Sequence, residues 1–85
     1  IWDNDLILDM PKKIRELKNL LLQSGFTCRT GKGSHTNWYH PLLSGRVTIS
    51  GKDGKDAKEY QEKDVSNAIK KIEEIKKTQE EAQNE

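Results

Sequence analysis

The sequence contains very little cysteine and no long apolar run. Cys28 is the single cysteine among 85 residues, so no disulfide can form within the chain and no multi-cysteine metal site can be built. No apolar stretch approaches the roughly 18 residues of a membrane-spanning helix, and no basic segment followed by an apolar one resembles a secretory signal. We therefore expect a protein of a reducing compartment, located in the cytoplasm, with no membrane partner.

Apolar residues are also scarce, at 32% against 34% charged residues. This balance is typical of disorder when the apolar residues are scattered, but here they cluster into regular patterns. A chain of 85 residues has room for one domain with a modest core and no separate cofactor domain. We expect one domain over residues 10–80 that needs no small-molecule cofactor. Residues 1–9 are expected to be a cloning remnant or an upstream extension, and residues 81–85 a frayed tail.

Acidic residues are few in the middle of the chain. Residues 10–58 hold ten Lys and Arg against three acids, a net charge of +7, whereas the two flanking segments each have a net charge of −3. A basic body between acidic ends is the distribution expected when the middle binds a polyanion. A merely solvated mixed-charge surface would give the same count.

The spacing of apolar residues predicts a helix at each end of the domain. The first cluster consists of Met10, Ile14, Leu17, Leu20 and Leu21, and the second of Val65, Ala68, Ile69 and Ile72. Asp9 is a plausible N-cap of the first helix, Pro11 is tolerated in its first turn, and Gly25 should end it. The second helix should start at Asp64 or a nearby polar residue, and the polar sequence beyond Ile75 should fray.

Three strands are predicted between the helices. Residues 26–30, 35–40 and 46–50 are the strand segments, separated by a Gly-Lys-Gly-Ser turn and by a reversal around Pro41, Ser44 and Gly45. A lysine-rich loop, residues 51–58, leads to the last helix. The expected fold class is α+β with the order α-β-β-β-α: a three-stranded antiparallel sheet with two helices on one face, which leaves the other face open to a partner.

Strand alternation places His35, Asn37 and Tyr39 on one face and Trp38 on the other. Because Trp38 is the larger apolar group and Asn37 is costly to bury, we expect Trp38 to face the helices and the other three to face solvent. By the same alternation Cys28 should point with Phe26 into the core, as an inert buried thiol.

The histidines allow only a single-histidine mechanism. His35 and His40 are five residues apart and point to opposite faces of an unbulged strand, so they cannot act as an acid–base pair. Histidine titrates near neutrality and can take a proton from a ribose 2′-hydroxyl, which then attacks the adjacent phosphate. Turn N–H groups before His35 could bind phosphate, and the cations that could stabilise the transition state are Arg29, Lys32, Arg46 and Lys52.

Plainer readings of the same residues exist. A lone exposed histidine is more often a surface residue than a catalyst, and His40 beside Pro41 suits a structural role. With no suitable third ligand, a metal site is not expected. The lysines of the loop before the last helix are equally typical of a solvated loop.

The Gly-Lys-Gly-Ser-His run of residues 31–35, followed by Trp38 and His40-Pro41, resembles the strand motif of the HicA toxins. The resemblance covers residues 10 to about 75, including Ser24-Gly25-Phe26 and the Gly-Arg-Val-Thr-Ile segment at residues 45–49. It implies a fold like that of double-stranded-RNA-binding domains and metal-independent endoribonuclease cleavage of mRNA. It also implies a role in a stress-response toxin–antitoxin system and neutralisation by a HicB-like antitoxin.

The family's catalytic histidine maps onto His35. The RNA-binding residues expected here are Arg29, Lys32, Gly33, Ser34, Arg46, Lys52, Lys55 and Lys58. Residues 50–63 depart from the shorter basic, proline-containing segment usual in the family.

Two other functions fit the same residues. A non-catalytic module of this fold would bind duplex RNA through its shape and phosphates, and a protein-interaction domain would use its basic face to meet an acidic partner.

Overall fold

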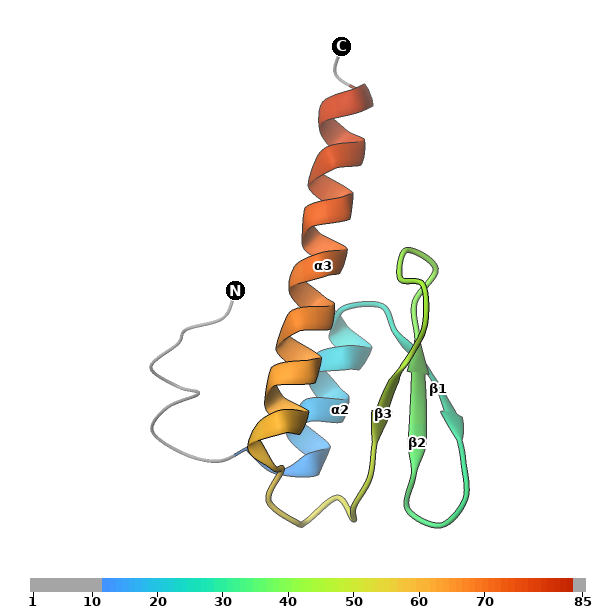
Figure 1. The fold of residues 1–85 in the computed structure, drawn as a ribbon, viewed down its shortest axis with the longest axis vertical. Helices are drawn as coiled ribbons and strands as arrows, with labels where there is room; N and C mark the ends of the chain where they lie inside the picture. Colours follow the sequence, from blue (N-terminus) through green and yellow to red (C-terminus); the bar gives the residue numbers. More distant parts are fainter. Residues whose placement is uncertain (1–11, 84–85) are drawn as a thin grey trace.

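One helix, three consecutive strands and a second helix follow one another along the chain, as the sequence predicts. The computed structural model describes residues 12–83, and its elements are α2 (Ile14–Gln23), β1 (Thr27–Thr30), β2 (Thr36–Tyr39), β3 (Val47–Ile49) and α3 (Glu59–Gln83). The strands form one antiparallel sheet in the order β1-β2-β3. Both helices lie on one side of this sheet (Figure 1). The predicted α+β fold class is therefore confirmed.

The core lies between the helices and the inner face of β2 and β3. Trp38 is 2% exposed and faces the helices, as the alternation predicts. Its ring Nε1–H donates to the Thr36 hydroxyl at 2.9 Å, and that hydroxyl donates to the Ile49 carbonyl at 3.2 Å, so the buried polar atom of the indole is satisfied. The buried apolar residues are Ile14, Leu17, Leu21, Phe26, Trp38, Val47, Ile49, Ala57, Val65, Ala68, Ile69 and Ile72.

Helix α2 ends at the predicted glycine. Gly25 has φ +93°, its N–H donates to the Leu22 carbonyl, and the Phe26 N–H donates to the Leu21 carbonyl. These two bonds and the apolar pair Phe26 and Leu21 form a Schellman motif. At the other end, Lys13 occupies the N-cap position. Asp9, Met10 and Pro11, to which the sequence assigned the helix start, lie outside the described residues.

Helix α3 is longer than predicted in both directions. It begins at Glu59, five residues before Asp64, and continues through Gln83, where fraying was predicted beyond Ile75. At its start the Gln61 side-chain oxygen accepts from the Lys58 N–H at 2.9 Å, which caps the first turn. The segment past Ile75 is rich in strong helix formers with opposite charges four residues apart, and it projects beyond the sheet (Figure 1).

The prediction that Cys28 is buried is wrong. Cys28 is exposed, as are all four residues of β1. Cys28 lies opposite Trp38 in the register of β1 and β2, so its side chain is on the inner face of the sheet. β1 is, however, the strand farthest from the helices (Figure 1), so no helical side chain covers it.

Candidate functional site

His35 lies at the end of the connection between β1 and β2 and is exposed. Its ring Nδ1 is 3.1 Å from the Lys32 carbonyl oxygen. A carbonyl can only accept a hydrogen bond, so Nδ1 must carry the hydrogen. In the neutral ring, Nε2 is then the nitrogen with a free lone pair.

The turn before His35 is closed by backbone hydrogen bonds at its two ends. The Gly31 N–H donates to the His35 carbonyl at 2.9 Å, and the His35 N–H donates to the Lys32 carbonyl at 3.1 Å. Gly33 has φ +60° at the tip, with open space around it. Within residues 12–83 the N–H groups of Lys32, Gly33 and Ser34 have no acceptor, so three consecutive donors remain available to an anion.

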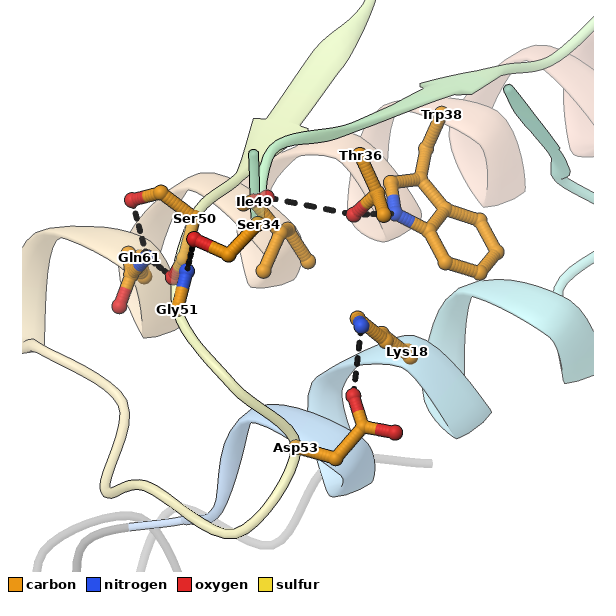
Figure 2. A network of polar contacts seen from close by, with 9 residues as sticks. All are labelled: Lys18, Ser34, Thr36, Trp38, Ile49, Ser50, Gly51, Asp53 and Gln61. Carbon is orange, nitrogen blue, oxygen red and sulfur yellow. Dashed lines mark hydrogen bonds and ion pairs between the residues drawn. The ribbon is translucent and has the colours of Figure 1, made fainter. Parts of the chain in front are cut away.

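A chain of hydrogen bonds connects this turn to the start of α3 (Figure 2). The Ser34 hydroxyl oxygen accepts from the Gly51 N–H at 3.2 Å, and the carbonyl of the preceding residue, Ser50, accepts from Gln61 Nε2 at 2.9 Å. Gln61 is 4% exposed, and its oxygen is used by the helix cap. A buried amide on α3 is therefore connected to the His35 turn through these two hydrogen bonds and the Ser50–Gly51 peptide.

The loop between β3 and α3 is held against α2 by both backbone and side chains. Lys18 pairs with Asp53 at 2.6 Å (Figure 2), and Lys13 pairs with Asp56 at 2.5 Å. The Ile14 N–H also donates to the Lys55 carbonyl at 2.9 Å. Both acids of this loop are therefore neutralised by lysines of the first helical segment, while Lys55 keeps an exposed side chain.

The open face of the sheet bears polar side chains from all three strands. In the register of the sheet, Arg29 of β1 lies opposite Asn37 of β2, and Asn37 lies opposite Thr48 of β3. The Thr48 hydroxyl donates to Asn37 Oδ1 at 2.9 Å, and the Arg29 guanidinium lies 5.7 Å from the centre of the Tyr39 ring. At the margin, Arg46 and Thr48 border an open, polar hollow of about 360 Å³ between β3 and α3.

The predicted site residues fall into two groups, and all of them are exposed. The turn–loop end consists of Lys32, Gly33, Ser34, His35, Lys52, Lys55 and Lys58. Within it, the bond from Gly51 brings Lys52 near the His35 turn, whereas Lys55 and Lys58 lie further along the loop. Arg29 lies on β1 instead, and Arg46 directly precedes β3.

No carboxylate lies on the sheet or its two turns. Residues 17–52 contain no Asp or Glu and five Lys or Arg. The charges that the sheet and its turns themselves contribute, from Arg29, Lys32 and Arg46, are therefore all positive.

His40 has a structural position, as predicted. Its ring lies 5.1 Å from the ring of Phe26, and its Nδ1 accepts from the Leu42 N–H at 3.0 Å. It does not approach His35, because the two side chains are on opposite faces of the sheet.

The sequence alone did not single out Gln61, the buried residue at the α3 end of the bracing network, which is the chain of contacts from Ser34 through Gly51 and Ser50 to Gln61. The available signal was a glutamine three residues after Lys58, the spacing of a capping box. Only the fold reveals that the other end of this amide reaches Ser50.

In residues 12–83 no three His, Cys, Asp or Glu side chains are grouped as metal ligands. Neither helix in that range has a stretch long and apolar enough to cross a bilayer.

The chain was also compared with known proteins. A family model described as the HicA toxin of bacterial toxin–antitoxin systems matches residues 14–75, from the first residue of α2 to the middle of α3. No curated protein and no solved structure matches the chain. The matched segment includes the whole sheet, the His35 turn and the bracing network, so the chain belongs to the HicA toxin family.

Proposed function

We propose that the chain is an endoribonuclease that cleaves mRNA, with His35 as the general base. The observation that supports this best is the contact between Nδ1 and the Lys32 carbonyl, which leaves Nε2 as the proton acceptor in an exposed turn that holds no carboxylate. Family membership supports a toxin of a toxin–antitoxin system.

The reaction uses the ribose next to the scissile phosphate as its nucleophile. His35 Nε2 removes the proton from the 2′-hydroxyl, and the 2′-oxygen forms a bond to phosphorus. The bond from phosphorus to the 5′-oxygen breaks, which leaves a 2′,3′-cyclic phosphate on one fragment. The departing 5′-oxygen takes a proton from water, and the imidazolium returns its proton to solvent.

The turn–loop end supplies groups that stabilise the additional negative charge on the phosphate. Three amide donors lie in the turn before His35, and Lys32 and Lys52 are the nearest lysines along the chain and across the Ser34 bond. Donors fixed before the reaction stabilise a transition state without reorganisation. No step of this scheme requires a metal ion.

The expected partners are mRNA and a HicB-like antitoxin. Translated mRNA is found in the cytoplasm, which is where the toxin would act. An acidic antitoxin surface could cover the positive surface around His35 and so block RNA.

The first prediction tests the general base. The His35→Ala variant should cleave an mRNA fragment at least a hundredfold more slowly, because general-base catalysis contributes roughly a hundredfold or more. Cleavage is measured on denaturing gels, with detection of cyclic phosphate ends, in the presence and absence of EDTA.

The control is Lys70→Ala on the exposed part of α3, which should cleave like the wild type. A His35→Ala protein that cleaves at the wild-type rate would rule out this mechanism. Wild-type protein that binds duplex RNA with steep salt dependence, yet leaves RNA length unchanged, would instead indicate the non-catalytic module.

A further inference from the structure

We infer that the open face of the sheet is a platform for single-stranded RNA, on which one base stacks against the Tyr39–Arg29 pair. The inference rests on the proposed function and extends it, since it names the form of RNA that reaches His35 and the residues that hold its bases.

The residues of β2 set the direction of the RNA. His35, Asn37 and Tyr39 alternate with the buried Trp38 and so lie on the same open face. Alternate residues of a strand are about 6.6 Å apart, so Tyr39 lies about 13 Å from His35 along β2. An RNA strand that places one ribose at His35 and continues along β2 must pass over Asn37 and then Tyr39.

The Tyr39–Arg29 pair has the chemistry of a base-stacking site. The guanidinium lies 5.7 Å from the ring centre, so a π-face and a planar cation are presented together. Unstacked RNA bases stack on aromatic rings and on guanidinium planes, and such stacking tolerates different bases. Tyr39 is partly exposed on a face that has no other aromatic side chain among the described residues.

Asn37 is oriented to make a second contact. The Thr48 hydroxyl donates to Asn37 Oδ1, which assigns the oxygen to Thr48 and leaves the amide Nδ2 hydrogens as donors. These donors lie between His35 and Tyr39, where they can bond an acceptor on a base or a ribose.

The distribution of charge favours a single strand over a duplex on this face. A duplex is held through phosphates and shape, and its bases are stacked on one another and unavailable to Tyr39. The lysines that suit phosphate lie at the turn–loop end, whereas the cations at the sheet are Arg29 on β1 and Arg46 directly before β3. The turn–loop end therefore binds the RNA backbone, and the open face of the sheet binds the RNA bases.

The second prediction tests the platform with an RNA that cannot be cleaved. A short single strand with 2′-O-methyl riboses lacks the nucleophile, and a 2-aminopurine in it loses fluorescence when it stacks. With Tyr39→Leu we expect affinity, measured by anisotropy, to fall roughly tenfold and quenching to be lost, because base–aromatic stacking is removed. Tyr39→Phe keeps the ring and should bind like the wild type.

The matched control is Tyr60→Leu, since Tyr60 is the other tyrosine and is 55% exposed at the start of α3, away from the sheet face. It should leave affinity and quenching unchanged. Equal affinity of Tyr39→Leu and wild type would overturn the platform, and so would a loss of affinity in Tyr60→Leu alone or tighter binding of the corresponding duplex. Circular dichroism of each variant checks that the fold is retained.

The two proposals can fail separately. Binding is measured here without cleavage, so an unreactive His35 would leave the Tyr39 result intact. Conversely, if the protein cleaves RNA and the Tyr39→Leu variant binds RNA as tightly as the wild type, the general base is supported and the platform is refuted.

Discussion

Ser34 contributes a hydrogen-bond acceptor to the surroundings of His35, and no charge. Its hydroxyl oxygen accepts from the Gly51 N–H, and through Ser50 and Gln61 this contact continues to the first turn of α3. A catalytic base must be held in reach of the proton that it removes, and small displacements are costly in rate. Ser34 therefore has the features of a positioning residue.

Removing the Ser34 hydroxyl gives the third prediction. Ser34→Ala should lower kcat for RNA cleavage about tenfold, because an unbraced turn misplaces His35. KM should change little, and the free energy of unfolding by less than about 0.5 kcal/mol, since the group is exposed. Steady-state kinetics and urea unfolding measure these quantities.

Two further variants separate positioning from a loss of polarity in general. Ser34→Thr restores the hydroxyl and should recover most of kcat. Ser44→Ala, an exposed serine in the connection between β2 and β3, should not alter the kinetics. An unchanged kcat in Ser34→Ala would mean that the contact with Gly51 does not position His35.

Trp38 and Cys28 show what alternation along a strand can predict. Both lie on the inner face, and Trp38 is buried as predicted while Cys28 is exposed. The face of a strand residue follows from the two-residue period. Whether that face is covered depends on where the helices cross the sheet, which local sequence does not encode.

At the scale of elements, the end of α2 depends on a glycine in the left-handed region. Gly25 has φ +93°, and a Cβ there would lie 3.3 Å from Nε2 of His40. Residues other than glycine rarely adopt this backbone conformation, because it costs them roughly 1–2 kcal/mol.

The fourth prediction follows from that geometry. Gly25→Ala should lower the free energy of unfolding by about 1–2 kcal/mol, through backbone strain and the approach to His40. Chemical denaturation monitored by circular dichroism measures the change.

Gly54→Ala is the matched control, because Gly54 has no positive φ and a Cβ there meets nothing within 4 Å. It should leave stability unchanged or raise it slightly. Equal stability of the two variants would mean that the Gly25 conformation is not required.

Element types and order were predictable from the sequence, and helix limits were not. The apolar spacing around Val65 and Ile72 predicted the face of α3 that is buried. Its start depends on Gln61, whose amide is drawn toward Ser50 by the fold, and its extension past Ile75 has no apolar period to mark it. In the same way the His35 turn was visible in the sequence, whereas its brace required contacts between distant segments.

At the scale of the whole molecule, the sheet and its turns have positive charges and no carboxylate, whereas α3 has half of the chain's fourteen acids. Residues 59–83 hold seven of the acids, whereas residues 17–52 hold none. An RNA strand that enters by the sheet therefore avoids repulsion from the long helix. Binding should release counterions and weaken as salt rises.

The fifth prediction concerns that salt dependence. Lys52→Ala should weaken binding of uncleavable RNA about equally for all sequences. It should also reduce the slope of log affinity against log salt concentration by about 0.7, the loss of one phosphate contact on a single strand. Titrations by anisotropy at several salt concentrations measure both effects.

Lys76→Ala, on the projecting part of α3, removes the same charge far from the sheet. Its slope should equal that of the wild type. If both variants reduce the slope equally, binding depends on net charge and not on the turn–loop end.

The exposed Cys28 offers a practical consequence for such experiments. It is the chain's one thiol, next to Arg29 in sequence but on the other face of the sheet. A maleimide dye attached there would lie on the opposite side of β1 from the face proposed to bind RNA, where it could report binding without obstructing it. The native protein thus supplies a position for a fluorescent reporter without mutagenesis.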